Sequence, residues 1–518
     1  MVETSKVSDE LANRLWAIAN DLRGNMDANK FRNYILGVIF YRYLSERTEQ
    51  YMDDLLKNDN ISYEKAFKDE RYENTVKKWS IKGLGYIMEP KYFFKNMVSD
   101  INNKTFSIED FEKAVASLTG STVGQESEAA FNKLFDDMNL QDKDLGSEVS
   151  DRTNLISKVI LQINDIDFHT EDTKVDILGT AYMILISKFA SDAGKKSGEF
   201  FTAVGPAHTL AKLATVGLDE VRTACDPCAG SGSLLLDLRD YVSTGKVGHY
   251  YAQEMNGTTY NLLRMNMLMH GVPYKQFTCF NGDTIKKDNF GDKKFQVQVA
   301  NPPYSCTYEP TSALLDDKRF SGAGKLAPKS YEDLMFLEHI IYHMDESDGR
   351  AAVLLPHGVL FRGGAEETIR THIIKNLNKI DAVIGLPANM FLTTSIPVVL
   401  LVLKSDRNGD SDNILFIDAS KEFKKGKKQN ELTEENIDKI VRTYTERKDV
   451  EKYARKVPIS EIEANGYNLN IPRYVDSSEE EEQLDLDDVL GRIAHDKEDV
   501  AAAEESLKSY FSELGILR

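Results

Sequence analysis

The 518-residue sequence has no long hydrophobic run, and its longest apolar stretch, residues 396–403, is far shorter than the roughly 20 residues that cross a bilayer. Its first residues are polar, so neither a secretory leader nor a membrane anchor is expected. Only four cysteines are present, which predicts a chain without a disulfide framework in the reducing cytoplasm. Basic residues are in the minority, since 83 acidic and 64 basic side chains give a net charge of −19. This charge argues against a chain that coats nucleic acid through its overall field, although a local basic groove stays possible.

Three kinds of chemical site are poorly supported. Cys225 and Cys228 have the spacing of zinc ligands, but no second close pair of cysteine or histidine accompanies them. His339 and His343 would share one helix face, yet isoleucine follows His339 where a zinc protease carries glutamate. Residues 322–325, Gly-Ala-Gly-Lys, lack the earlier glycine of a phosphate-binding loop. Neither a metal ion nor ATP hydrolysis is therefore expected of this chain.

The order of helical and β-rich segments predicts two large domains. In residues 1–170, apolar residues recur at helical spacing and proline is rare, which predicts an all-α domain with a mostly polar connection at 120–150. In residues 171–475, short β-rich runs alternate with helical segments. The expected strands are 221–225, 248–253, 276–281, 295–300, 349–355, 380–386 and 396–404. This alternation predicts an α/β fold with a doubly wound, mostly parallel sheet that binds ligands at the carboxyl ends of its strands.

Residues 476–518 form a third part, which begins with the acidic run Ser-Ser-Glu-Glu-Glu-Glu. Such a run is typical of a solvated linker. A C-terminal helical segment follows, and its apolar stripe could dock on a partner or on the chain's own core. The stripe consists of Val489, Ile493, Val500, Leu507 and Phe511.

The first expected strand leads into a loop of small residues, Asp226-Pro-Cys-Ala-Gly-Ser-Gly-Ser233. Small residues let the backbone approach a ligand closely, and the helix that follows offers its positive N-terminus. The loop is not an NAD fingerprint, because leucine occupies the position of the third glycine. The candidate cofactor-binding residues of this loop are Asp226, Gly230, Ser231, Gly232 and Ser233.

The next two expected strands end in acidic residues. Glu254 follows Gly232 by about 22 residues, the spacing at which a carboxylate meets ribose hydroxyls. Asp283 follows the third strand and could accept a hydrogen bond from an exocyclic amine. Either acid alone would more often be a surface or capping residue. A glycine-rich loop and two acids at three successive strand ends favour a nucleotide-like cofactor.

The fourth expected strand ends in Asn301, Pro302, Pro303 and Tyr304. Proline has no N–H to donate, so the two prolines end the strand abruptly. The simple interpretation is a strand-terminating turn. The alternative is a rigid cradle that directs the carboxamide of Asn301, nearby carbonyls and the ring of Tyr304 at one ligand.

In this order the motifs resemble the class I methyltransferases that use S-adenosylmethionine (AdoMet), and Asn-Pro-Pro-Tyr is similar to the motif of those that methylate an amino nitrogen. Upstream, four residues are similar to the element with which such DNA methyltransferases close over the methionine end of AdoMet. These are Glu199, Phe200, Phe201 and Thr202. With the N-terminal helical domain and the stretch 465–474, the resemblance extends to the modification subunit of type I restriction–modification systems.

The resemblance implies a chemistry for the cradle. Asn301 Oδ1 and the Pro302 carbonyl would accept the two hydrogens of adenine N6 and turn its lone pair toward the methyl group. Two acceptors in these positions reject the keto oxygen of guanine. Tyr304 would stack on an adenine rotated out of double-stranded DNA. No general base is required, because the proton can leave after methyl transfer.

The resemblance also implies partners. A separate specificity subunit would read the DNA and bind two copies of this chain, and a restriction subunit would supply the ATP-dependent motor and nuclease. Two basic segments have open roles in the chain itself. Residues 307–330, with Lys318 and Arg319, are either a mobile basic loop near the substrate or a plain surface loop. Residues 421–428 are the densest basic run and either contact phosphates or form a solvated turn.

Two other functions are compatible with parts of this pattern. A protein glutamine also carries an amide that the cradle could hold, and a non-catalytic scaffold could bind AdoMet without transferring its methyl group. The chain length and the N-terminal helical domain argue against a protein-glutamine methyltransferase. The intact amine cradle argues against a scaffold. We therefore expect a DNA adenine-N6 methyltransferase subunit.

Overall fold

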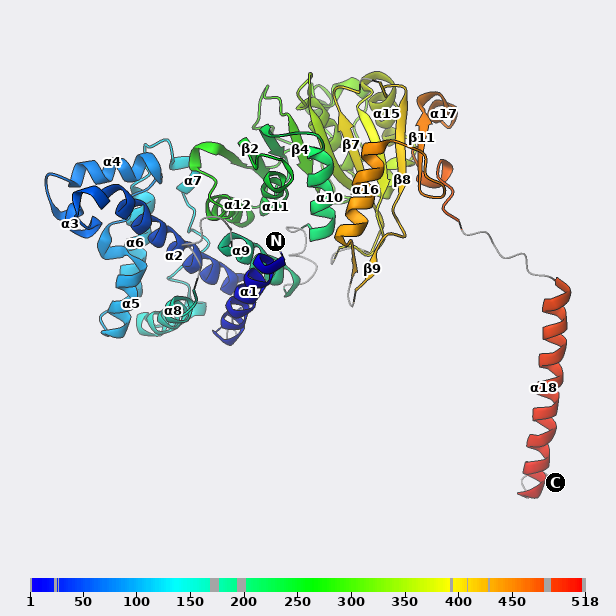
Figure 1. Ribbon diagram of the computed structural model, residues 1–518, viewed down its shortest axis with the longest axis horizontal. Coiled ribbons are helices and arrows are strands. Elements are labelled where there is room, and N and C mark those ends of the chain that lie inside the picture. Colours follow the sequence, from blue (N-terminus) through cyan, green and yellow to red (C-terminus); the bar gives the residue numbers. More distant parts are fainter. Residues whose placement is uncertain are drawn as a thin grey trace. The chain divides into compact units, whose positions relative to one another are not determined.

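Figure 1 shows the computed structural model, which describes residues 2–22, 26, 28–167, 177–192, 202–391, 395–407, 409–426, 429–478 and 486–514. The chain divides into two compact units, Met1–Val475 and Asp476–Arg518. Within the described ranges, no helix is both long and apolar enough to cross a membrane.

The N-terminal part of the first unit is helical, as predicted. Its helices are α1 Val2–Leu22, α2 Ala28–Leu56, α3 Tyr63–Lys68, α4 Glu73–Gly83, α5 Phe94–Asn102, α6 Ile108–Gly120, α7 Glu128–Phe131, α8 Val149–Asn164 and α9 Ile177–Asp192. α1 packs against α8 and α9, and α2 packs against α5, α8 and α9. The polar connection expected at 120–150 instead joins this core, because Phe131, Leu134 and Phe135 are buried. These three residues have helical spacing, but the apolar pattern is too short to be recognised in the sequence among its polar neighbours.

A nine-stranded sheet lies at the centre of residues 202–475. Its strands are β1 Val221–Asp226, β2 Val247–Glu254, β3 Phe277–Asn281, β4 Val297–Ala300, β5 Arg350–Pro356, β6 Ile380–Gly385, β7 Val398–Lys404, β8 Asn413–Asp418 and β11 Ala454–Pro458. They are ordered β11-β8-β6-β7-β5-β4-β1-β2-β3. β1 to β5 are mutually parallel, whereas β7 runs antiparallel between β5 and β6, and β11 is antiparallel to β8. The predicted doubly wound, mostly parallel sheet is confirmed.

The strand order reverses between β1 and β4, which are direct neighbours although β2 and β3 separate them in the sequence. In doubly wound sheets a ligand binds in the crevice at such a reversal, outside the carboxyl ends of the strands. The loop of small residues follows the carboxyl end of β1, and the Asn-Pro-Pro-Tyr motif follows that of β4. The topology therefore places the two motifs at the same edge of the sheet.

Helices cover both faces of the sheet, and each central strand divides its side chains between two cores because successive residues point to opposite faces. Leu354 of β5 lies in the core that continues into the N-terminal helices, whereas Val353 and Leu355 lie in the opposite core. The helices around the sheet are α10 Val204–Thr215, α11 Ser233–Asp237, α12 Gly257–Met269 and α16 Glu434–Glu446 on the first face, α14 Asp333–Tyr342 and α15 Ala365–His372 on the second, and the short α13 Ser312–Leu315 and α17 Ile459–Ala464. Both faces of the central strands are thus removed from water.

α12 connects the N-terminal helices to the sheet. The buried Arg264 donates to the carbonyl oxygens of Ala129 at 3.0 Å and Asn132 at 2.9 Å. Asp137 accepts from Asn261 Nδ2 at 2.6 Å. These polar contacts, together with the shared apolar core, make the helical part and the sheet one unit.

Some elements of the sheet region differ from the sequence predictions. β8 and β11 are not among the predicted elements. β11 is an edge strand whose residues Arg455 and Lys456 face solvent in part, so its apolar pattern is weak. In the strand expected at 295–300, the polar Gln298 is buried and donates to the Ile340 carbonyl at 2.8 Å.

The described part of the second unit is one long helix, α18 Leu486–Glu513. Val489 and Phe511 of the expected stripe are partly exposed, and the other large apolar side chains described for α18 and for Leu514 after it are exposed on the surface of this unit. The exposed ones are Leu490, Ile493, Val500, Leu507, Tyr510 and Leu514.

Candidate active site

Asn301 follows the last residue of β4, and its side chain is held from two sides. Its Nδ2 donates to Thr202 Oγ1 at 3.0 Å, and its Oδ1 accepts from the Tyr304 hydroxyl at 2.6 Å. Thr202 is buried just before α10, while Asn301 is half-buried. The carboxamide is therefore fixed in orientation and still partly accessible, which a plain strand-terminating turn would not require.

The backbone after the motif is held by a buried carboxylate. Pro302 is buried, and Ser305 adopts a left-handed φ of 52°, a conformation that costs a residue with a side chain roughly 1–3 kcal/mol. The N–H of Ser305 donates to Asp333 Oδ1 at 2.9 Å. Burial raises the pKa of Asp333, and the hydrogen bond from Ser305 lowers it in part. Asp333, at the start of α14, thus positions the Asn-Pro-Pro-Tyr turn.

The loop after β1 needs glycine for two separate reasons. Gly230 and Gly232 adopt left-handed φ angles of 55° and 81°. A Cβ on Gly232 would also lie 2.5 Å from Leu263 Cδ1, so the loop could not pack this closely against α12 with any larger residue. Asn266 of α12 donates to the Ser231 carbonyl at 2.8 Å. The loop is thereby held in one conformation.

Two buried polar atoms in this loop have no hydrogen-bond partner among the described residues, namely Asp226 Oδ2 and Ser231 Oγ. Asp226 is only 1% exposed, and its other oxygen accepts from the Cys228 N–H at 2.9 Å. Burial raises the pKa of Asp226 to about 7, against the lowering effect of the Cys228 hydrogen bonds. Unpaired buried polar groups destabilise a fold, so these two atoms fit a ligand that bonds to them. Ser233 is buried beside them as the first residue of α11.

Glu254 lies at the carboxyl end of β2 and faces the same loop. Its Oε2 accepts from the Gly230 N–H at 2.9 Å, and its Oε1 accepts from the Asn256 N–H at 2.8 Å. Burial raises the pKa of Glu254, while these backbone hydrogen bonds lower it. Each carboxylate oxygen keeps lone-pair capacity, so the side chain can still accept from two hydroxyls of a ribose.

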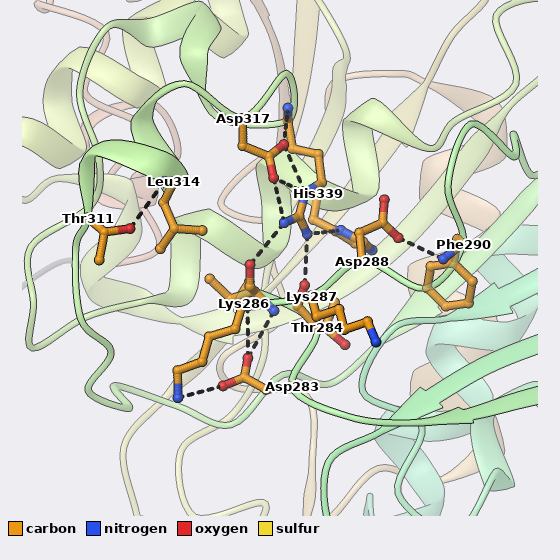
Figure 2. Close-up of polar contacts among 12 residues, drawn as sticks. Asp283, Thr284, Lys286, Lys287, Asp288, Phe290, Thr311, Leu314, Asp317 and His339 are labelled. Carbon is orange, nitrogen blue, oxygen red and sulfur yellow. Dashed lines mark hydrogen bonds and ion pairs between the residues drawn. The ribbon is translucent and has the colours of Figure 1, made fainter.

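Asp283 begins the turn after β3, and its carboxylate is more engaged than the sequence predicts (Figure 2). Its Oδ1 accepts from the N–H groups of Ile285 and Lys286 at 3.1 Å each. Its Oδ2 pairs with Lys286 Nζ at 3.1 Å. Because Lys286 is exposed, that ion pair contributes little and can give way to another donor. The Gly282 N–H donates to the Glu254 carbonyl at 3.0 Å, so the second and third strand ends are adjacent.

The loop after β1 and the Asn-Pro-Pro-Tyr motif are in contact at Cys228. Burial raises the pKa of its thiol, and a hydrogen bond from the backbone of Asn301 lowers it. The structure therefore brings Thr202, the loop after β1, Glu254 and the motif together at one edge of the sheet. Glu199, Phe200 and Phe201 lie outside the described residues.

Comparison with known proteins agrees with this geometry. The N-6 DNA Methylase family matches residues 173–483, and the HsdM N-terminal domain matches residues 11–163. The MpnII type I restriction enzyme methylase subunit of Mycoplasma pneumoniae is 37% identical over 91% of this chain and 90% of its own length. The chain belongs to the methylase subunits of type I restriction enzymes.

Solved structures support the same assignment. The methyltransferase subunit of a type I restriction–modification system from Streptococcus thermophilus is 38% identical, with a TM-score of 0.83 over 90% of this chain and 100% of its own. A chain from a structure of type I R-M complex assembly has a TM-score of 0.63 at 17% identity and supports the fold alone. The methylase subunit is an AdoMet-dependent, adenine-specific DNA methyltransferase, and neither alternative function finds support.

The sequence predictions for the methylase site omit Phe391 and the hydroxyl of Tyr304. The rings of Tyr304 and Phe391 meet edge to face, with centroids 6.1 Å apart and planes at 83°. Phe391 is buried in the segment after β6, and only its place after a strand end could have indicated it. The Tyr304 hydroxyl bonds to Asn301, so this side chain contributes more than a ring.

The structure corrects the role expected for Arg319, which is buried rather than part of a mobile basic loop. Its guanidinium donates to the carbonyls of Thr284 at 2.7 Å and Ile285 at 2.9 Å, and to Asp317 Oδ2 at 2.8 Å. Figure 2 shows Asp317 and Thr284 on the two segments that these bonds connect. Arg319 thus connects the loop after the Asn-Pro-Pro-Tyr motif to the turn that begins with Asp283. Because its side chain is buried, it is not available to DNA.

The side chains of Asp288, His339 and His343 have ligand-type atoms within 4.8 Å of one another. His343 Nε2 faces Asp288 at 3.0 Å, and its Nδ1 faces the Lys293 carbonyl at 2.7 Å. His339 Nδ1 lies 3.0 Å from Arg319 Nη1. A fixed guanidinium charge in contact with this cluster opposes a bound cation, so the arrangement suits a structural network better than a metal site.

Proposed function

We propose that this methylase subunit binds AdoMet in the crevice between β1 and β4 and methylates N6 of an adenine rotated out of double-stranded DNA. The observation that carries the proposal is the double restraint on Asn301, whose amide is bonded to Thr202 and to Tyr304. A restrained amide next to a cofactor loop is the arrangement that orientation of a flat amine requires.

The residues present fit AdoMet. Asp226 Oδ2 and Ser231 Oγ are buried polar atoms with no bonding partner in the described ranges; Asp226 ends β1, and Ser231 lies in the loop after it. Glu254 is suited to the ribose hydroxyls, and Asp283 to the exocyclic amine of the adenine ring. When bound, AdoMet supplies an electrophilic methyl group. Glu199, Phe200, Phe201, Gly230, Gly232 and Ser233 complete the proposed site.

The Asn-Pro-Pro-Tyr motif orients the target amine. Asn301 Oδ1 accepts one hydrogen bond from the Tyr304 hydroxyl and has a second lone pair for one N6–H of the target. The Pro302 carbonyl accepts the other N6–H, and Pro303 keeps the backbone rigid. Holding both hydrogens on one side directs the nitrogen lone pair away from them, toward the methyl donor.

The pocket also discriminates between bases. Asn301 Oδ1 and the Pro302 carbonyl are both acceptors, and the keto oxygen of guanine is also an acceptor. No hydrogen bond could form between them, so guanine would be rejected. The rings of Tyr304 and Phe391 stand at 83° to each other and offer a face and an edge to a rotated base. No side chain has to remove a proton before transfer, because the methylated amine loses it readily afterwards.

The test of this proposal is the variant Asn301→Ala. It should lose methyl transfer to DNA while keeping AdoMet affinity and a cooperative fold, because the amide contacts the target and not the cofactor; loss of its two hydrogen bonds should lower thermal stability only modestly. Asn96→Ala is a matched control, since it removes an amide that donates to the Pro90 carbonyl at 2.7 Å in the N-terminal helices. Near-normal turnover by the Asn301 variant would show that the cradle is wrongly assigned.

We also propose that the subunit acts in a cytoplasmic complex with a specificity subunit and a restriction subunit, two copies of this chain per complex. With a net charge of −19, the isolated chain is poorly suited to hold DNA by itself. Ile493, Val500 and Leu507 of α18 and Leu514 directly after it recur every seven residues and are exposed, which favours a helix that pairs with another helix. We assign α18 to contact with the specificity subunit.

A further inference from the structure

A short two-stranded ribbon stands apart from the main sheet. β9 Lys424–Lys425 pairs antiparallel with β10 Asn430–Glu431 and with no strand of the nine-stranded sheet among the described residues. Gly426 permits its tight end, since a Cβ there would lie 2.2 Å from the Gln429 carbonyl. In Figure 1 β9 extends beyond the end of α16. We call β9 and β10 the basic ribbon.

β10 of the basic ribbon is attached through Asn430 to the target side of the active site. The Asn430 N–H donates to the Asn389 carbonyl at 2.8 Å, and Asn430 Nδ2 donates to the Ala388 carbonyl at 2.8 Å. Both acceptors belong to the segment that leads from β6 to Phe391, whose ring meets Tyr304. The ribbon therefore projects from the rim of the proposed adenine pocket.

A second attachment connects the basic ribbon to the cofactor side. Leu432, the residue after β10, packs so closely on Gly205 of α10 that a Cβ on Gly205 would lie 2.8 Å from it. Gly205 is three residues after Thr202, which bonds to Asn301. The ribbon is thus fixed to both walls of the site.

The charge of the basic ribbon is directed to solvent. Lys424 and Lys425 are exposed, and only Lys424 has an acid opposite it in the ribbon register, Glu431. Two of the neighbouring acids are already paired. Glu422 bonds to Lys439, and Glu434 bonds to Lys212 at 2.9 Å. A local positive charge therefore stands next to the adenine pocket of a strongly acidic chain.

We propose that Lys424 and Lys425 bind the phosphate backbone of the DNA strand beside the rotated adenine. This inference rests on the proposed function, because it assumes that DNA lies across the carboxyl edge of the sheet. Rotation of a base displaces its flanking phosphates, and fixed charges next to the pocket can hold them in that position. Lys427 and Lys428 of the basic run lie outside the described residues.

The test compares Lys424→Ala/Lys425→Ala with wild type in the complex with the specificity subunit, on plasmid DNA that the wild-type complex methylates. The KM for DNA should rise about tenfold at physiological salt, and the slope of log affinity against log salt should fall by about 1.8, or 0.9 per phosphate contact. Because the lysines touch neither cofactor nor target base, kcat at saturating DNA and the AdoMet Kd should stay unchanged. Lys424→Arg/Lys425→Arg should restore the wild-type KM.

The matched control is Lys78→Ala/Lys82→Ala, which makes the same charge change at exposed positions of α4, far from β9 (Figure 1). An unchanged KM and salt slope in the ribbon variant would overturn the inference, as would an equal loss in the control. Loss of assembly with the specificity subunit at normal DNA affinity would overturn it too, in favour of an acidic protein surface. A wild-type complex that methylates no adenine would instead refute the proposed function itself.

Discussion

The replacement of Asp226 by asparagine should make this methylase subunit more stable relative to wild type as the pH rises, and it should weaken the binding of AdoMet. Asp226 is 1% exposed, and its Oδ2 has no hydrogen-bond partner in the described part of the chain. Burial raises its pKa from 3.8 to about 7. Because the folded-state pKa is above the unfolded-state value, the native protein holds this proton more tightly than the unfolded chain. Stability is therefore lost as the pH rises from about 4 to about 7.

The magnitude follows from the two pKa values. A difference between 3.8 and about 7 corresponds to about 4 kcal/mol of unfolding free energy above pH 7. At pH 5 the native carboxyl is still protonated, and the cost is about 2 kcal/mol. An asparagine side chain at this position would have no charge to bury, although its amide hydrogens would lack a partner at a cost of about 1–3 kcal/mol. That second cost does not depend on pH, so Asp226→Asn should gain stability relative to wild type between pH 5 and pH 8.

The assay is chemical denaturation of both proteins at pH 5 and pH 8, combined with calorimetric titration of AdoMet. The variant should bind AdoMet more weakly by about 1.5–3 kcal/mol, since it loses a charged acceptor. The wild-type affinity should fall as the pH drops below 7, because binding then requires loss of the Asp226 proton. The pKa of Glu254 is also raised by burial, and this residue is unchanged in the variant. A pH dependence that both proteins share is therefore not assigned to Asp226. A stability difference that is the same at both pH values would refute the reasoning.

Two further predictions concern the target pocket and the C-terminal helix. Tyr304→Phe should lower methyl transfer roughly two- to tenfold with unchanged AdoMet affinity, since it removes one hydrogen bond to Asn301, worth roughly 0.5–1.5 kcal/mol; wild-type turnover would show that only the ring matters. Replacing Ile493, Val500 and Leu507 by glutamine should impair co-purification with the specificity subunit and DNA methylation, while AdoMet binding by unit Met1–Val475 is spared. Normal assembly of that variant would remove α18 from the interface.

The sequence by itself determined the fold class and the chemistry of the site. Alternating β-rich and helical segments are local patterns, so they predict a doubly wound sheet without knowledge of any distant contact. Asp226, Glu254 and Asn301 each follow an apolar run, and the carboxyl ends of parallel strands must share one edge of the sheet. The residues of each motif are contiguous in the chain, so the family resemblance could be recognised from the sequence. That resemblance predicted the reaction.

Only the tertiary structure decided which side chains bond to each other. Thr202 and Asn301 are 99 residues apart in the chain and meet through one hydrogen bond that no local pattern encodes. Arg319 looks like one of several loop cations in the sequence, yet the fold surrounds it with carbonyl oxygens and buries it. Long-range contacts also attach β10, the partner of Lys424 and Lys425, to the segment that leads to Phe391, and no pattern in the residues beside them encodes that attachment.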